Sequence, residues 1–174
     1  MSRRFSLSQQ LTLVFTAILL LCAIAACSIQ LYNSSQFGNA MVQRLSAGLA
    51  QQIVNREPLL DEQGEVNRQR LKMLFDRLMT LNPSVELYLV SRDGNIVADA
   101  APPGHMKRKQ INVEPLKAFL DGAAWPIYGD DPRSLDKEKV FSVAPVLLNG
   151  NLHGYLYIIL EGENLNALAD NAWR

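Results

Sequence analysis

Residues 129–134 read Gly-Asp-Asp-Pro-Arg-Ser and place two carboxylates beside a guanidinium in a predicted turn. Asp130 and Asp131 could together hold a cation or an ammonium group. The alternative is a self-satisfied turn, in which an aspartate caps backbone N–H groups and pairs with Arg133. The turn lies in an irregular stretch, residues 123–136, and a loop of that length in a compact domain is often functional. We therefore treat its charged residues as candidate ligand contacts.

Three polar side chains fall within predicted strands and are candidates for a pocket between a sheet and its helices: Tyr88, Ser142 and Tyr155. Tyrosine and serine hydroxyls also complete hydrogen bonds inside protein cores, which is the alternative for all three. A basic triplet, residues 107–109, could attract an anion or the phosphate surface of a membrane. The alternative for this triplet is a solvated loop.

The sequence contains no pattern typical of catalysis or of a metal site. It has no CxxC or HExxH motif, neither of the common glycine-rich phosphate loops, and only two histidines, His105 and His153, 48 positions apart. We expect each histidine to be a surface or structural residue. Without a nucleophile and base, a carboxylate pair in a pocket or a metal cluster, we expect no catalytic activity, metal or cofactor, and a protein that binds rather than converts.

An uncharged stretch, Leu11 to Ile29, is long enough to cross a bilayer as a helix. No charged side chain occurs between Arg4 and Arg44, whereas the short stub before the stretch carries Arg3 and Arg4 and no acid. By the positive-inside rule the stub stays in the cytoplasm. We therefore predict a cytoplasmic stub at residues 1–10, a transmembrane helix at 11–31 and a periplasmic domain at 32–174, in a bacterial inner membrane.

The same stretch permits a second interpretation. A basic start followed by an apolar run also describes a cleaved signal peptide, and Ile24-Ala25-Ala26-Cys27 is similar to a lipoprotein cleavage box with Cys27 as the acylated residue. Apolar character continues past Cys27, and the following sequence predicts a helix rather than a flexible tether. These observations favour an uncut anchor, with an envelope lipoprotein that serves as a binding or assembly partner as the alternative.

Residues 31–56 predict that the anchor continues as a helix in water. Apolar residues recur there at every fourth position and form one narrow stripe. Such a stripe can pack on its own domain or against the same helix of a second copy, and the sequence does not choose between them. Its members are Phe37, Met41, Leu45, Leu49 and Ile53.

The remaining residues predict an α+β domain with a central antiparallel sheet flanked by helices. The clearest signal is Asn149-Gly150 between two nearly continuous apolar runs, which predicts a hairpin in the middle of the sheet. Pro145 lies in the first of these runs and predicts a bulge or an unpaired edge there. Further elements are expected as helices at 66–81, 114–121 and 163–173, and as a hairpin at 85–90 and 96–98.

The composition limits the possible size and partners of the domain. About 140 residues follow the anchor, which is the size of one compact domain with one core. The chain has 17 basic and 17 acidic residues; with Arg3 and Arg4 assigned to the cytoplasm, the external part holds 15 against 17. A net charge near minus two argues against nucleic acid as a partner. Both cysteines lie in the apolar stretch, so the domain folds without disulfides.

Taken in order, these elements resemble the input end of a bacterial sensor histidine kinase whose periplasmic part is a PAS-like (PDC-type) sensor between two membrane helices. The similarity covers residues 11–174. The segments that carry it are Leu71-Lys-Met-Leu-Phe-Asp-Arg-Leu-Met79, Asn82-Pro-Ser-Val-Glu-Leu-Tyr-Leu89 with Asp93-Gly94, Gly129-Asp-Asp-Pro-Arg-Ser134, Lys139-Val-Phe-Ser142 and Gly154-Tyr-Leu-Tyr157.

The resemblance implies a periplasmic sensor of a two-component system, in which the helix leaving the membrane forms a homodimer and carries a signal inward. A second membrane helix, a HAMP linker, a phosphoacceptor helix and an ATP-binding domain are missing from the sequence, which we therefore expect to be a fragment or a truncated product. A small molecule or an envelope protein is the expected ligand. The candidate ligand-binding residues are Tyr88, Asp130, Asp131, Arg133, Lys139, Ser142 and Tyr155.

Overall fold

A computed structural model describes residues 6–81, 85–99 and 106–160 of the protein. The chain is α+β: a long apolar N-terminal helix is followed by a domain built on one curled antiparallel sheet. It divides into two compact units, residues 1–38 and 39–174.

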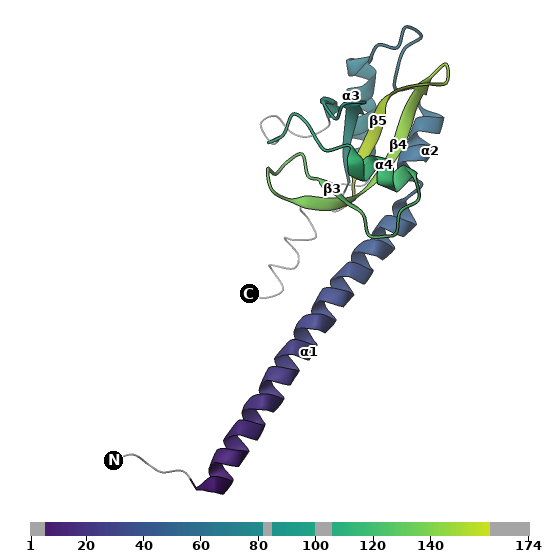
Figure 1. Cartoon of the computed structure of the whole chain (residues 1–174). Helices are drawn as coiled ribbons and strands as arrows, with labels where there is room; N and C mark the ends of the chain where they lie inside the picture. The colour runs from purple at the N-terminus through teal and green to yellow at the C-terminus, as the bar shows by residue number, and fades with distance from the viewer. Residues whose placement is uncertain (1–5, 82–84, 100–105, 161–174) are drawn as a thin grey trace. The chain divides into compact units, whose positions relative to one another are not determined.

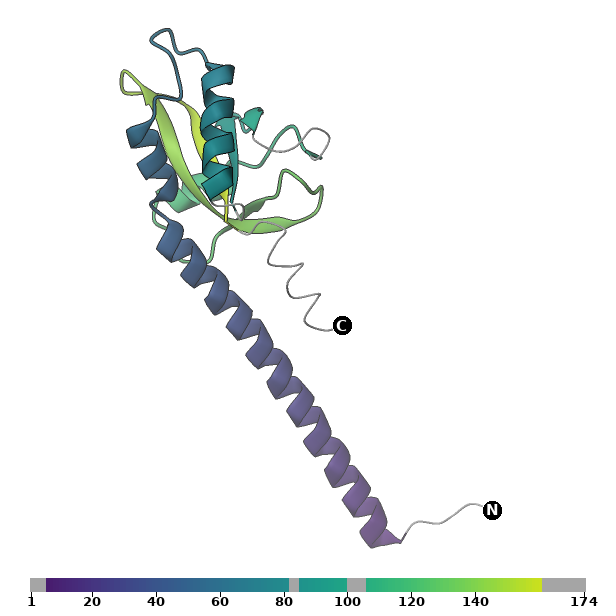
Figure 2. The same cartoon turned by 180° about the vertical axis from the view of Figure 1, so that it is seen from behind.

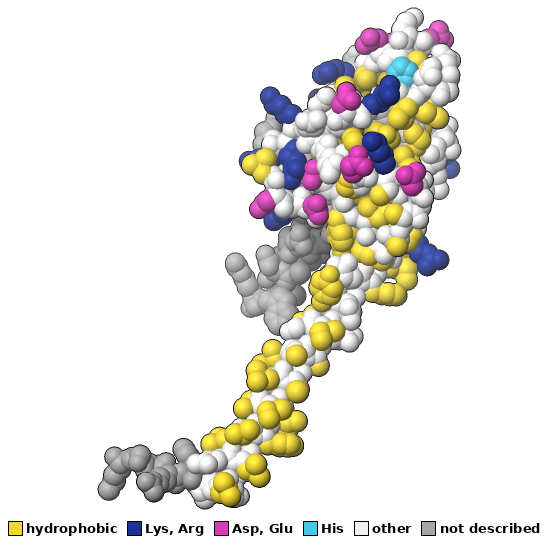
Figure 3. Space-filling view, in the orientation of Figure 1, with side chains coloured by type: hydrophobic (Ala, Val, Ile, Leu, Met, Phe, Trp, Pro, Cys, Tyr) yellow, Lys and Arg dark blue, Asp and Glu magenta, His cyan; other side chains and the backbone are white. Residues whose placement is uncertain are grey.

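The first unit is helical and apolar. Helix α1 (Leu7–Ser46) is continuous through Cys27 and carries no charged residue before Arg44. Hydrophobic side chains cover its surface, as the space-filling view shows (Figure 3), and none of its most apolar stretch is buried within the protein. By length and composition α1 can span a membrane, although a signal sequence has the same properties.

The second unit contains five strands in the described part of the chain, all antiparallel, in the order β2-β1-β5-β4-β3. The predicted central hairpin is confirmed, because β5 is the middle strand and β4 lies next to it. Asn149 and Gly150 form its turn with φ values of 53° and 79°. The strands are β1 (Glu86–Ser91), β2 (Ile96–Asp99), β3 (Tyr128–Asp130), β4 (Glu138–Leu148) and β5 (Asn151–Ile159).

Pro145 occupies the part of β4 that β3 does not reach. It lies opposite Tyr155 of β5, and the register shifts between Val146 and Leu147. Because β3 pairs only with residues 138–140 of β4, no described strand needs a hydrogen bond from the nitrogen of Pro145 on that side. The expected irregularity at Pro145 is therefore present as an unpaired edge with a bulge beside it.

Helices cover both faces of the sheet (Figures 1 and 2). On one face, α2 (Leu49–Arg56) and α3 (Arg68–Leu81) pack an aliphatic cluster against the strands. On the other face, α4 (Glu114–Leu120) covers a cluster rich in aromatic rings. Alternation along each strand explains this division, since Leu87 and Leu89 of β1 join the aliphatic cluster while Tyr88 and Val90 join the aromatic one.

The prediction of one helix over residues 31–56 is wrong at one point. Helix α1 ends at Ser46 and α2 begins at Leu49. The Ser142 hydroxyl donates to the Ala47 carbonyl (2.9 Å) and accepts from the Ala50 N–H (3.3 Å), so a side chain of β4 satisfies backbone groups at the interruption. The break turns Ile53 and the fully buried Ala50 toward the sheet.

The other predicted elements fall close to their expected places. Helix α3 begins two residues later than expected, and the predicted hairpin and short helix are present as β1 with β2 and as α4. Gly122 ends α4 with φ +81°, as a C-terminal cap requires. The helix predicted for residues 163–173 lies outside the described residues.

Candidate functional site

Six charged side chains gather at one end of the sheet and form what we call the charged cluster: Glu86, Arg108, Asp130, Asp131, Arg133 and Lys139. They make three ion pairs. Arg133 contacts Glu86 at 2.6 Å, Arg108 contacts Asp130 at 3.1 Å and Lys139 contacts Asp131 at 3.3 Å. All six side chains are at least four-fifths buried, so solvent screens these pairs less than it screens pairs on the surface.

The ends of three strands bring these groups together. Glu86 is the first residue of β1, Asp130 is the last residue of β3, and Lys139 is the second residue of β4. The loop between β3 and β4 supplies Asp131 and Arg133. Because β3 and β4 are antiparallel neighbours, this loop returns to the same end of the sheet from which it left.

Asp131 organises the loop between β3 and β4. Its Oδ1 accepts a hydrogen bond from the Arg133 N–H at 3.0 Å, and its carbonyl accepts one from Ser134 at 3.0 Å. This agrees with the capping half of the self-satisfied turn. The guanidinium of Arg133, however, reaches across to Glu86 of β1. The predicted turn is therefore tied to the sheet and not only to itself.

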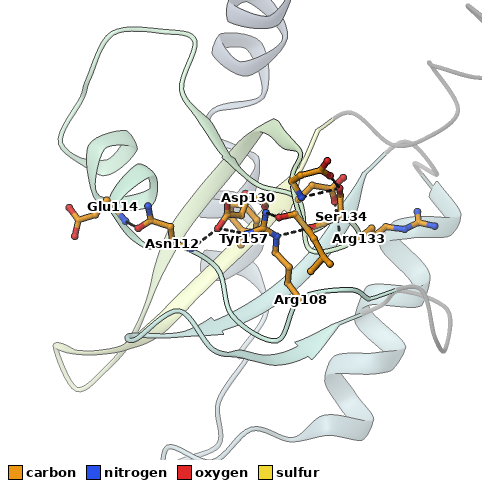
Figure 4. A network of polar contacts seen from close by, with 10 residues as sticks. Arg108, Asn112, Glu114, Asp130, Arg133, Ser134 and Tyr157 are labelled. Atoms are coloured by element: carbon orange, nitrogen blue, oxygen red, sulfur yellow. Dashed lines mark hydrogen bonds and ion pairs between the residues drawn. The ribbon is translucent and has the colours of Figure 1, made fainter.

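Arg108 binds its own segment of the chain to the loop between β3 and β4 (Figure 4). Besides its ion pair with Asp130, its Nε donates to the Ser134 carbonyl at 2.6 Å and its Nη2 donates to the Leu135 carbonyl. The same carboxylate oxygen of Asp130, Oδ2, also accepts a hydrogen bond from the Asn112 N–H at 2.9 Å. The middle residue of the basic triplet is thus four-fifths buried and bonded, unlike the solvated side chain that the sequence suggested.

Two tyrosines connect the charged cluster to the aromatic face of the sheet. The Tyr88 hydroxyl donates to Glu86 at 2.9 Å, and the Tyr157 hydroxyl donates to the Asp130 carbonyl at 2.8 Å. Burial raises the pKa of both phenols well above the usual value, and nearby carboxylates, Glu86 for Tyr88 and Asp130 for Tyr157, raise it further. Both hydroxyls therefore stay protonated and act as donors at any physiological pH.

Gln43 is a buried contact that sequence reasoning missed. It lies in the last turns of α1 and is fully buried. Its side-chain amide donates to the carbonyls of Ile127 (2.8 Å) and Phe141 (3.0 Å), and its oxygen accepts from the Ile127 N–H (2.7 Å). No local signal points to it, because Gln43 lies two positions after Met41 and therefore on the other side of the helix from the apolar stripe. A polar residue at that position is expected to face solvent.

The structure brings five of the predicted ligand-binding residues together and separates two. Tyr88, Asp130, Asp131, Arg133 and Lys139 lie in or beside the charged cluster. Ser142 instead bonds the junction of α1 and α2 on the aliphatic side. Tyr155 is buried in the aromatic cluster opposite Pro145.

The predicted apolar stripe also divides. Leu49 and Ile53 pack against the aliphatic cluster, whereas Phe37, Met41 and Leu45 are exposed. His153 lies on β5 beside Gly64. It lines a hollow of about 190 Å³, while a hollow of about 250 Å³ lies between α2 and α3. Neither hollow is lined by any of the predicted ligand-binding residues.

No family model, curated protein or solved structure matches the chain. Function must therefore be argued from the site itself. Among the described residues no group of three or more histidine, cysteine, aspartate or glutamate side chains could hold a metal ion. Three acids paired with three bases suit the recognition of a charged group, which can replace one member of a pair, better than they suit catalysis.

Proposed function

We propose that the chain is a membrane-anchored sensory module, the periplasmic PAS-like (PDC-type) input part of a two-component sensor histidine kinase. Three features support this proposal: a helix apolar enough to span a membrane, a following α+β domain with helices on both faces of an antiparallel sheet, and the order of these elements along the chain. In this proposal α1 is uncut, its start lies in the cytoplasm and residues 32–174 lie in the periplasm.

The observation that carries the sensory role is the charged cluster. An apolar core of the same shape would hold these strand ends together equally well or better, because desolvating charges offsets much of the attraction between them. Nearly buried ion pairs instead provide groups whose partners can be exchanged. Glu86, paired with Arg133, lies next to the loop between β3 and β4 and is a suitable point for such an exchange.

A charged ligand would act by competing for one member of a pair. A ligand carboxylate would compete with Glu86 for Arg133, and a ligand ammonium group would compete with Arg133 for Glu86. In either case the loop between β3 and β4 loses its tie to β1 and takes a second arrangement. The ligand shifts the equilibrium only by the difference in its affinity for the two arrangements.

The exposed apolar residues of α1 give this module a route to a homodimer. Phe37, Met41 and Leu45 recur at four-residue spacing and are all exposed. In the proposed dimer these residues of two copies contact each other. A change of the domain would then alter the packing of two helices that lead into the membrane.

A reporter fusion tests the proposal. The chain is placed ahead of a second membrane helix and the cytoplasmic kinase part of a characterised sensor, and output is read from a promoter controlled by that kinase. We expect Glu86→Gln and Arg133→Gln to change the basal output by about fivefold or more, the lower end of typical coupling between sites. Arg70→Gln on the exposed side of α3 is the matched control and should leave output unchanged. Equal output from all variants, at equal amounts in the membrane, would contradict a sensory role.

A further inference from the structure

The strand β3 contacts two parts of the domain, the last turns of α1 and the charged cluster, beside the contact that α1 makes with Phe141 of β4. It pairs with β4 through only three residues, and no described strand lies on its other side. So short an edge strand is held mainly by its neighbours' side chains. Its position therefore depends on what those side chains do.

The two ends of β3 bind different partners. At its start, Ile127 is bonded through both its N–H and its carbonyl to Gln43, and the Tyr128 hydroxyl accepts a hydrogen bond from Asn39 at 3.1 Å. At its end, Asp130 bonds to Arg108 and accepts a hydrogen bond from the Asn112 N–H. One strand of three residues thus lies between the last turns of α1 and the charged cluster.

The middle of β3 is in direct contact with the aromatic face. A Cβ atom at Gly129 would lie 2.5 Å from the Tyr157 hydroxyl and 2.9 Å from a ring carbon of Phe141. Only glycine fits at this distance. A displacement of Asp130 along or away from the sheet must therefore also move the backbone of its neighbour Gly129. Gly129 has no side chain that could absorb this movement against the rings of Tyr157 and Phe141.

Gln43 makes the contact between α1 and the start of β3 either complete or absent. Its amide is fully buried, and its three hydrogen bonds go to Ile127 and Phe141. A buried amide that loses its hydrogen-bond partners without gaining others costs free energy, so a small slide of α1 against β3 is disfavoured. A complete repositioning that gives the amide new partners does not carry this cost. This is the property that a two-position switch requires.

We propose that β3 is a coupling strand and that Gln43 is the positioning residue through which a change in the charged cluster reaches residues 39–46 of α1. This inference rests on the proposed function for its biological meaning. The coupling itself is a property of the domain and can be measured without any kinase, so a failure of the inference and a failure of the proposed function can be told apart.

Hydrogen exchange on the full chain in lipid nanodiscs tests the coupling. The perturbation is Arg108→Gln, which changes the cluster without touching α1, and the readout is the exchange rate of backbone amides in residues 39–50. We expect these amides to exchange about fivefold faster or more in Arg108→Gln, as a loss of about 1 kcal/mol of local stability would produce. Arg70→Gln is the matched control and should leave them unchanged.

A second substitution tests the role of Gln43. Gln43→Met keeps a side chain of similar length without the amide, and we expect it to accelerate exchange in residues 39–50 by itself and to remove any further effect of Arg108→Gln. Gln51→Ala, an exposed glutamine of α2, is the control for this background. If Gln43→Met does not fold, Tyr128→Phe, which removes the Asn39 contact, should reduce the effect of Arg108→Gln.

Two results would overturn the inference. In the first, Arg108→Gln accelerates exchange in residues 127–137 but leaves residues 39–50 unchanged, which means that cluster and helix are independent. In the second, the full effect of Arg108→Gln persists in Gln43→Met and in Tyr128→Phe, which means that the effect travels by another route. Either result can occur while the reporter fusion still responds to the cluster variants. In that case the sensory role is supported, but the signal does not pass through β3 and Gln43.

Discussion

The two faces of the sheet are built from different chemistry. The face under α2 and α3 is aliphatic and is closed by leucine, isoleucine, valine and alanine side chains around Phe75. The face under α4 is aromatic, and the rings of Phe141 and Tyr157 lie 5.1 Å apart. Its tyrosine hydroxyls reach the charged cluster. The aliphatic face is held mainly by apolar packing, with Ser142 bonding the junction of α1 and α2, whereas the aromatic face carries tyrosine hydroxyls into contact with the charged cluster.

The aliphatic face should give the largest loss of stability. Phe75 is fully buried between α3 and the sheet. Phe75→Ala removes its apolar contacts and leaves a cavity, so we expect the free energy of unfolding to fall by about 3–5 kcal/mol. Urea unfolding of the full chain in detergent micelles, followed by circular dichroism, measures this change. A loss below about 1 kcal/mol would show that packing on this face contributes little to the stability of the domain.

The Glu86–Arg133 pair should behave as a charge pair and not as packing. Removing one partner with Glu86→Leu leaves a nearly buried guanidinium, and we expect a loss of about 2–3 kcal/mol, less than for a fully buried pair because Arg133 keeps some solvent contact. The double variant with Arg133→Met should recover most of that loss. If the double variant is no more stable than Glu86→Leu in urea unfolding, the loss of stability in Glu86→Leu does not come from breaking the ion pair.

High pH should weaken the aromatic face. Because the pKa of Tyr88 is raised in the folded protein, the native state keeps the phenol proton above about pH 10 while the unfolded chain loses it. The unfolded state then binds fewer protons, so stability present below about pH 10 is lost as the pH rises, by about 1.4 kcal/mol per unit for one such group. Tyr88→Phe should reduce the slope of unfolding free energy against pH by that amount. An unchanged slope between about pH 10 and 12 would contradict the buried phenol.

The smallest effect is expected from one hydroxyl. Tyr157→Phe keeps the ring that packs on Phe141 and removes the hydrogen bond to the Asp130 carbonyl. We expect a loss of about 1 kcal/mol, the usual net value of one such bond. A change in thermal unfolding much larger than this would mean that the hydroxyl holds the charged cluster in place, which would sharpen the distinction between the two faces.

Local patterns in the sequence predict most of the fold. Asn149-Gly150 between two apolar runs gives the central hairpin, because positive φ at both residues suits a tight turn. Apolar residues at helical spacing predict α3, and Pro115 and Gly122 predict where α4 begins and ends. The break between α1 and α2 could not be read in this way. It depends on Ser142, which is 92 positions from Ala50 and meets it only in the folded chain.

The candidate site is predicted only in part for the same reason. The turn at 129–134 shows its two carboxylates in sequence, so Asp130 and Asp131 could be found. Two members of the cluster are distant from this turn in the chain: Arg108, the partner of Asp130, belongs to a triplet with the pattern of a solvated loop, and Glu86, the partner of Arg133, is a single polar residue at the start of a strand. Pairing across 22 to 47 positions follows from the order of strands, which local spacing does not determine.

The lipoprotein alternative also has a direct test. Cys27→Ser removes the residue that would be acylated and should leave the size and membrane retention of the protein unchanged if α1 is an uncut anchor. Gel mobility and membrane fractionation measure both. Loss of a lipid modification, or release of the domain from the membrane, would support the lipoprotein.

The central claim is that α1 holds the α+β domain on the far side of the membrane from Arg3 and Arg4. One measurement tests it most directly: labelling of a single cysteine at Gln63, an exposed loop residue, in a chain with Cys22→Ser and Cys27→Ser, by a membrane-impermeant maleimide. The reagent is added to cells whose outer membrane is permeable. We predict complete labelling in these cells while the inner membrane is intact, because the reagent then reaches only the periplasmic side. Labelling only after the inner membrane is broken would place the domain in the cytoplasm and contradict the account.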